Sequence, residues 1–71
     1  MSADILFEEL GYVKSYEGEF IARYIGNSNT SYDLIVVGKK AGAMAIVDSK
    51  ESRIELPELK AIAKKIEERG W

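Results

Sequence analysis

The 71-residue chain contains neither cysteine nor histidine, and this absence limits how so short a sequence can be stabilised. Disulfides are excluded, and so are the zinc sites that depend on thiolate or imidazole ligands. A chain of this size buries only about 60% of the surface that its unfolded form exposes, so its core supplies a narrow margin of stability. The sequence predicts a single domain over residues 1–71 that relies on apolar packing and, we expect, on association.

The overall balance of residues is that of a folded domain with no strong attraction to polyanions. Hydrophobic residues make up 46% of the chain and charged residues 31%, which favours a packed core over disorder. The net charge of −2 argues against a protein that coats nucleic acid. The first residues lack the regions of a signal peptide, and the aliphatic run at 34–37 is too short to span a bilayer. We expect a cytoplasmic protein without membrane contact.

The missing side chains also restrict chemistry. Without histidine and cysteine, the Ser-His-Asp triad, thiol nucleophiles and imidazole acid–base catalysis are excluded. The carboxylates occur in pairs that are typical of a solvated surface, and no loop has the oxygen-ligand spacing of a calcium site. We therefore expect a protein that is not an enzyme and that binds no cofactor or metal.

A glycine followed by an aromatic residue marks the end of a short N-terminal helix. Ser2 is suited to cap a helix over residues 3–10. Gly11 would end it as the left-handed residue of a Schellman motif, which places Tyr12 against Phe7. The spacing therefore predicts both the helix and the contact that closes it.

The same device ends an amphipathic C-terminal helix. Pro57 suits its first position, and Gly70 would end it with Trp71 lying over Ile66. Capping and packing therefore explain the terminal tryptophan without a ligand. The apolar stripe expected to face the core consists of Leu59, Ile62, Ala63 and Ile66.

Between the helices lie four segments rich in β-branched and aromatic residues, separated by turns that contain glycine. Short connections favour antiparallel neighbours. The predicted fold is therefore α+β, in the order α-β-β-β-β-α, with the helices packed on one face of a four-stranded antiparallel meander. The strands are predicted over residues 12–16, 19–25, 32–38 and 43–48.

The turns predict which side chains share a face of the sheet. A two-residue turn at 17–18 places Val13 opposite Ala22, and a four-residue turn at 39–42 places Val36 opposite Ala45. These registers give the helix-facing side no charge. That side is predicted to carry Val13, Phe20, Ala22, Tyr24, Leu34, Val36, Ala45 and Val47.

The opposite face then keeps an apolar centre with a charged rim, which is the layout of a protein interface. We expect a partner protein or a second copy of the chain to bind there. The alternative is that the chain wraps around these residues, so that they form ordinary core. The expected partner-binding residues are Tyr12, Tyr16, Ile21, Arg23, Ile35, Val37, Met44 and Ile46.

Basic residues on the outer side of the C-terminal helix suggest a different role, that of a nucleic-acid-associated regulator. Glutamates interleave with them at helical spacing, as Glu68 does with Lys64, so mutual pairing on a solvated face is the simpler interpretation. The candidate nucleic-acid-binding residues are Lys60, Lys64, Lys65 and Arg69.

Residues 7–12 (FEELGY) and 58–71 (ELKAIAKKIEERGW) together resemble the two ends of small uncharacterised proteins encoded by phages and prophages of Gram-positive bacteria, the YopT-like kind. The resemblance is confined to the ends of the chain, and Ala63 and Arg69 depart from it. It implies an accessory protein of a mobile element that binds or inhibits a host or defence protein. It supplies no catalytic residues.

Overall fold

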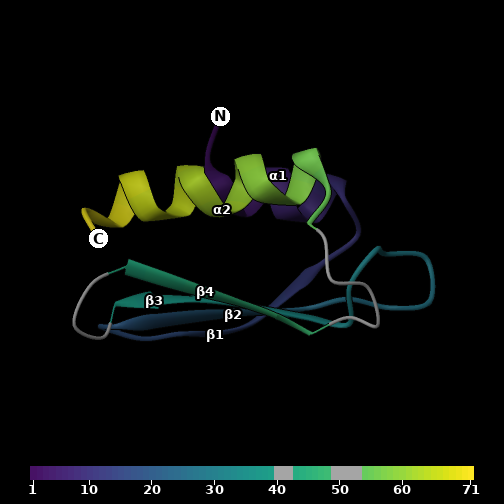
Figure 1. Ribbon diagram of the computed structural model, residues 1–71, viewed down its shortest axis with the longest axis horizontal. Coiled ribbons are helices and arrows are strands. Elements are labelled where there is room, and N and C mark those ends of the chain that lie inside the picture. Colours follow the sequence, from purple (N-terminus) through teal and green to yellow (C-terminus); the bar gives the residue numbers. More distant parts are fainter. Residues whose placement is uncertain (40–42, 49–53) are drawn as a thin grey trace.

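A computed structural model shows two layers, in which both helices lie on the same face of one sheet (Figure 1). The structure describes residues 1–39 and 54–71, together with the backbone of residues 43–48. The α+β class, the short N-terminal helix, the antiparallel sheet and the C-terminal helix predicted from the sequence are confirmed. The elements are α1 (Ala3–Glu9), β1 (Val13–Glu17), β2 (Ile21–Ile25), β3 (Leu34–Lys39), β4 (Ala43–Asp48) and α2 (Leu56–Arg69).

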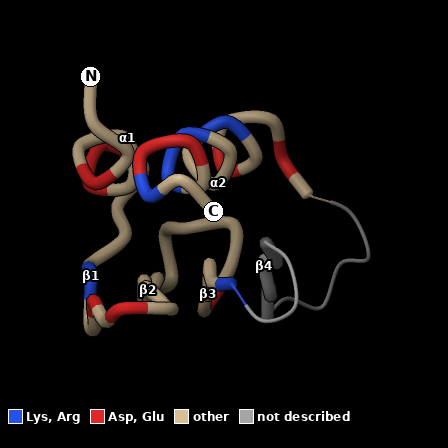
Figure 2. Tube along the Cα trace, turned by 90° about the vertical axis from the view of Figure 1, so that its left-hand side faces the viewer, with Lys and Arg blue, Asp and Glu red and all other residues tan. Residues whose placement is uncertain are grey.

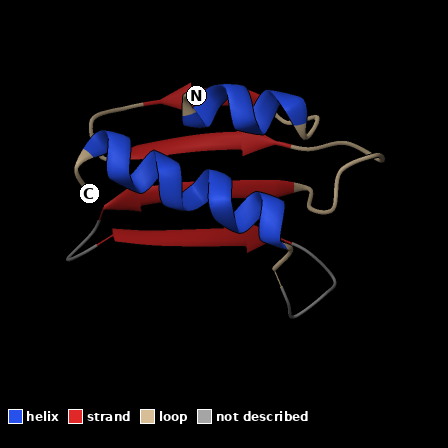
Figure 3. Ribbon diagram, turned by 90° about the horizontal axis from the view of Figure 1, so that it is seen from above, coloured by secondary structure: helices blue, strands red, loops and turns tan. Residues whose placement is uncertain are grey.

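Each strand pairs with its neighbour in sequence, so the sheet is an antiparallel meander in the order β1-β2-β3-β4. The strand β4 is described by its backbone pairing with β3. The helix α1 lies over the β1 edge, and α2 runs obliquely over the middle of the sheet (Figure 3). The helices are antiparallel, and the Ala3 N–H at the start of α1 donates to Glu68 Oε2 near the end of α2 at 3.0 Å. Ser2 caps α1 as predicted, its Oγ accepting from the Ile5 N–H.

Both predicted helix ends are confirmed. Gly11 and Gly70 have φ angles of 100° and 68°, in the left-handed region that glycine adopts without strain. The Tyr12 N–H donates to the Phe7 carbonyl at 3.0 Å, which is the long bond of the Schellman motif. Trp71 makes the equivalent 3.0 Å bond at the end of α2. These turns return an aromatic residue to the core directly after each helix.

Aromatic rings occupy the centre of the interface between the helices and the sheet. The Phe7 ring stacks on Tyr24, with centroids 3.8 Å apart and planes 17° apart. Tyr12 meets the same Phe7 edge to face at 6.0 Å. The buried cluster consists of Phe7, Tyr12, Ala22, Tyr24, Tyr32, Ile35, Val37, Ala61 and Ile62.

The register predicted for the first hairpin is wrong. Val13 pairs with Ile25, and the register shifts between Lys14 and Tyr16 because β1 contains an irregularity there. As a result Lys14 turns toward α1, while Val13 is 66% exposed on the far face. Phe20, which was also expected under the helices, lies exposed in the hairpin connection.

The register predicted for β3 is wrong by one residue. Val37 pairs with Ala45, whereas Val36 was expected to do so. A slip of one residue moves every side chain of a strand to the other face. Ile35 and Val37 therefore lie fully buried beneath the helices, and Leu34 points to the opposite face.

The predicted turn length is the source of this error. Lys39 is the last residue of β3 and pairs with Ala43, so the turn expected over residues 39–42 begins one residue too early. The residues 40–42 themselves lie outside the described residues. Three of the eight expected partner-binding residues are therefore absent from the surface. The register buries Ile35 and Val37, and Tyr12 is buried as well.

The stripe predicted on α2 is partly wrong, because the helix turns two charged side chains toward the sheet. Leu59 and Ala63 are exposed, and Ile66 packs against the edge of the core. Glu58 and Lys65 take the buried positions, each with a hydrogen-bond partner across the interface. The buried residues of α2 are Glu58, Ala61, Ile62 and Lys65.

The two faces can be told apart by a matched pair of substitutions. Ile35→Glu places an unpaired carboxylate in the core, and we expect the variant to lose the fold, since a cost of several kcal/mol equals the stability of a small domain. Ile25 lies on β2, which pairs with β3, but its side chain is on the opposite face and is 47% exposed. We expect Ile25→Glu to lose less than about 1 kcal/mol in the free energy of unfolding. Thermal unfolding followed by circular dichroism measures both. A folded Ile35→Glu protein would contradict the register.

Candidate functional site

A network of charges joins the helix layer to the first hairpin. Its centre is Lys65, which is 4% exposed. The Lys65 ammonium donates to Glu17 Oε1 at 2.6 Å and to Asp4 Oδ1 at 3.1 Å. Asp4 also accepts from Lys14 at 2.8 Å. One buried cation of α2 is thereby shared between α1 and β1.

The C-terminal end of α2 is attached to the same hairpin through Arg69. Its guanidinium forms an ion pair with Glu17 and donates to the carbonyls of Gly18 and Glu19 at 2.8 and 2.9 Å. The guanidinium also lies over the Trp71 ring, 4.4 Å from the centroid. These contacts fix the hairpin connection beneath the last turn of the helix.

The network keeps Asp4 ionised. Partial burial by itself would raise the pKa of Asp4, but hydrogen bonds from Lys14, Tyr24 and Lys65 outweigh it and hold the pKa far below its usual range. Burial, together with the 2.5 Å hydrogen bond that the Tyr24 hydroxyl donates to Asp4, raises the pKa of Tyr24 well above its ordinary value. Tyr24 therefore acts as a neutral donor.

A second buried contact ties α2 to the loop before β3. The Tyr12 hydroxyl donates to Glu58 Oε2 at 3.0 Å and accepts from the Tyr32 N–H at 3.2 Å. Burial and the contact with Glu58 raise the pKa of Tyr12 far above its usual range. Glu58 Oε1 is buried and has no hydrogen-bond partner among the described residues. Tyr12 thus acts inside the core and is unavailable to a partner.

The face of the sheet turned away from the helices carries the exposed apolar side chains of the strands. Val13, Ile25 and Leu34 pair in one row across β1, β2 and β3. Val13 and Ile25 are 66% and 47% exposed, and Leu34 is half-buried. We call this surface the open face; its described residues are Val13, Tyr16, Ile21, Arg23, Ile25, Leu34 and Val36, of which Val36 is buried.

Arg23 and Tyr16 form a second row on the open face. Tyr16 pairs with Arg23 across the bulge and is 49% exposed. The Arg23 guanidinium lies 5.7 Å from the centre of the Tyr16 ring and donates to Ser15 Oγ at 3.1 Å. Among the described residues of this face, Arg23 carries the one charge. Figure 2 shows that charged segments concentrate instead along the helices and the β1–β2 hairpin.

The structure places the expected partner-binding residues in two different environments. Tyr16, Ile21 and Arg23 lie on the open face, as predicted. Tyr12, Ile35 and Val37 were expected there and are buried instead. Met44 and Ile46 pair with Gly38 and Val36, which gives them positions on the open face, although their side chains lie outside the described residues. Val13 was not predicted on this face, because no feature of the sequence indicates the bulge at Ser15.

The four candidate nucleic-acid-binding residues do not form one basic surface. Lys65 is buried, and Arg69 turns toward the hairpin, where both meet Glu17. Lys64 pairs with Glu67 at 3.6 Å, and Lys60 stays exposed near the start of α2. The outer side expected from helical spacing is therefore reduced to two lysines, because long-range carboxylates attract the other two cations inward.

The described residues hold neither a group suited to a metal ion nor a helix suited to cross a membrane. Among them, no three acidic side chains are grouped so that they could hold a metal ion. Neither described helix combines the length and apolar character that crossing a bilayer requires. Comparison of the chain with protein-family models, with characterised proteins and with solved structures finds no match in any of the three.

The charge network predicts how stability depends on pH. Because the pKa of Asp4 is lower in the folded protein than its ordinary value of 3.8, the carboxylate contributes its full stabilisation above about pH 5 and loses it as the pH falls through 3.8 and below. We expect Asp4→Asn to cost about 1–2 kcal/mol at pH 7, because the buried Lys65 ammonium loses one of its two carboxylate partners. Urea unfolding at a series of pH values measures both effects.

Between about pH 5 and 3, the free energy of unfolding of Asp4→Asn should also fall less steeply than that of the parent protein. The variant lacks the carboxylate whose protonation destabilises the parent in this range. Asp33→Asn serves as the control, since Asp33 is exposed and contributes no side chain to the network. Parallel pH profiles for Asp4→Asn and the parent protein would contradict the assigned role of Asp4.

Proposed function

We propose that this protein is a non-enzymatic interaction module that binds a partner protein through its open face. The observation that carries the proposal is the row formed by Val13, Ile25 and Leu34, which lies in register across three strands and is not covered by either helix. An apolar row of this kind on a small domain is typical of an interaction surface. The face of a sheet suits the surface of a folded protein better than it suits a small ligand, which needs a concave site.

The residues beside this row support recognition of a protein. Arginine and tyrosine are enriched among the residues that contribute most to protein interfaces. Ser15 and the Tyr16 ring hold the Arg23 guanidinium in place, so little conformational entropy is lost when a partner contacts it. An acidic group on the partner would complement this single cation. The open face thus combines an apolar centre with one preorganised charge.

The kind of partner is proposed from the resemblance at the two chain ends. Residues 7–12 and 58–71 resemble the ends of uncharacterised proteins of phages and prophages, and we expect an accessory protein of this kind to act on a protein of the host cell. The module would then bind, and thereby inhibit, a host or defence protein in the cytoplasm.

A nucleic-acid-associated role receives less support from the contacts of α2. Basic side chains bind a nucleic acid by contacting its phosphates, which releases the counterions held there. This needs several lysines or arginines that are not already paired with carboxylates. Lys65 and Arg69 are instead engaged by Glu17. The open face therefore remains the preferred surface.

Capture of proteins from a lysate of the native host tests the proposal when two variants of equal charge are compared. Ile25→Glu places a carboxylate in the apolar row, whereas Ser28→Glu places it in the exposed loop between β2 and β3. We expect Ile25→Glu to weaken capture by roughly tenfold or more, since a buried unpaired charge is costly at an interface. Ser28→Glu should capture as the parent protein does.

Circular dichroism of both variants serves as the control that the fold is retained. Equal capture by Ile25→Glu and the parent protein would place binding elsewhere and overturn the proposal. Binding of duplex DNA by the parent protein with a steep salt dependence would favour the nucleic-acid role in its place.

A further inference from the structure

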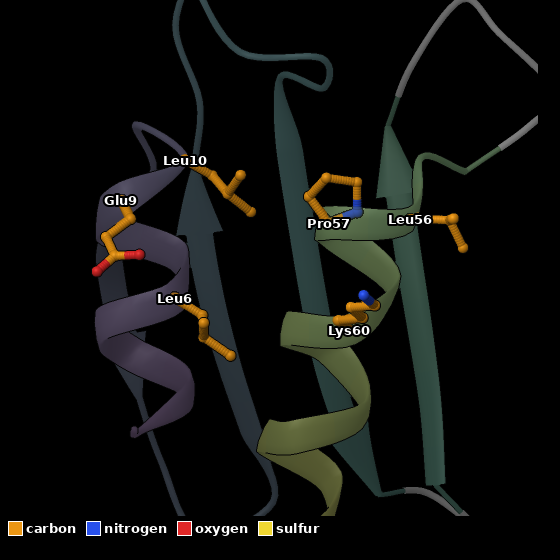
Figure 4. Close-up of a pocket in the computed structure, with 6 residues that line it drawn as sticks. All are labelled: Leu6, Glu9, Leu10, Leu56, Pro57 and Lys60. Atoms are coloured by element: carbon orange, nitrogen blue, oxygen red, sulfur yellow. The ribbon is translucent and has the colours of Figure 1, made fainter.

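A groove of about 300 Å³ lies on the outer side of the helix layer, between the C-terminal end of α1 and the first turns of α2 (Figure 4). Leu6 and Leu10 project into it from the α1 side, and Pro57 from α2. The walls are mainly apolar, so water in the groove has few hydrogen-bond partners and is readily displaced. The groove is open on the side opposite the sheet, where neither described layer covers it.

Each wall of the groove carries one charge, and the two charges are opposite. Glu9 belongs to the α1 wall and Lys60 to the α2 wall. Both are exposed, and neither forms an ion pair with another described residue. The Leu56 side chain stands beside Pro57 at the edge of the groove and is 66% exposed. The surface therefore combines a hollow, an apolar projection and, on each wall, one exposed charge without an ion-pair partner among the described residues.

Such a surface is complementary to itself. A two-fold axis that runs along the groove places α1 of one copy over α2 of its partner, because the two helices form opposite walls. The same rotation brings Glu9 of each copy toward Lys60 of the other, and it brings Leu56 toward the leucines of the partner's α1 wall. A groove with charges of one sign would repel its own copy. The opposite signs on the two walls are the feature that favours a second copy over another occupant.

We propose that this groove is a dimerisation surface and that its occupant is a second copy of the chain. The interface is isologous, and it forms two intermolecular pairs between Glu9 and Lys60. A stable dimer buries roughly 800 Å² on each copy, about one-sixth of the 4671 Å² accessible surface of this molecule. Exposed Ile5 and Leu59 extend the apolar area on the two helices.

A charge exchange between the walls tests the proposal on the full chain. Glu9→Lys alone places two lysines opposite each other in both pairs, and Lys60→Glu alone places two glutamates there. We expect each single variant to weaken dimerisation by roughly tenfold or more, since like charges at an interface are repulsive. The double variant Glu9→Lys/Lys60→Glu restores both pairs and should dimerise to within about threefold of the parent protein.

Mixing the two single variants gives the sharpest result. A Glu9→Lys chain and a Lys60→Glu chain have complementary walls, so an equimolar mixture should form a heterodimer whose mass is the sum of the two. Native mass spectrometry distinguishes it, because the variants differ in mass. Sedimentation equilibrium gives the dissociation constants. Glu8→Lys is the matched control, since Glu8 is exposed on α1 and does not line the groove.

Three outcomes would overturn the proposal. The first is a parent protein that stays monomeric at about 100 μM, a concentration at which a dimer with a dissociation constant of about 100 μM or below is substantially populated. The second is a dimer that survives both single substitutions. The third is a dimer that is lost on Ile25→Glu and kept on Glu9→Lys, which would place self-association on the open face. None of these depends on whether a partner protein is captured, so the two proposals can fail separately.

Discussion

The ammonium group of Lys65 is the contact on which the arrangement of the layers depends. It lies buried between Asp4 of α1 and Glu17 of β1, so it joins α2 to two elements at the other end of the sequence. A buried cation without its carboxylates would be strongly destabilising. Glu58 lies seven residues earlier on the same side of α2 and is fixed by the Tyr12 hydroxyl. These two contacts set the rotation of α2 about its axis.

That rotation determines the outer surface of the molecule. With Glu58 and Lys65 facing the sheet, the helix must turn Leu56, Leu59 and Lys60 outward. The α2 wall of the groove, with Lys60, is a consequence of the same rotation. Electrostatic pairing inside the molecule thus leaves Leu56 and Leu59 exposed on a helix that otherwise buries the apolar Ala61 and Ile62.

Local features of the fold could be predicted from the sequence, and long-range ones could not. Ser2, Gly11 and Gly70 end or begin their helices as expected, because capping depends on residues that are near in sequence. The register of β3 was missed because residues 34–37 are apolar on both faces and show no alternation. The bulge in β1 and the burial of Lys65 depend on partners across the fold. Three of the open-face residues were nevertheless identified.

The open face and the groove lie on opposite sides of a two-layer molecule, so occupation of one leaves the other accessible (Figure 1). In a dimer that packs helix layer against helix layer, the two open faces point away from each other. Such a dimer cannot place both faces on neighbouring sites of one flat surface, so it gains no avidity there. It can instead link two separate partner molecules. The proposed dimer and the proposed open-face interaction together predict a module that bridges two partners and does not mask a single extended surface.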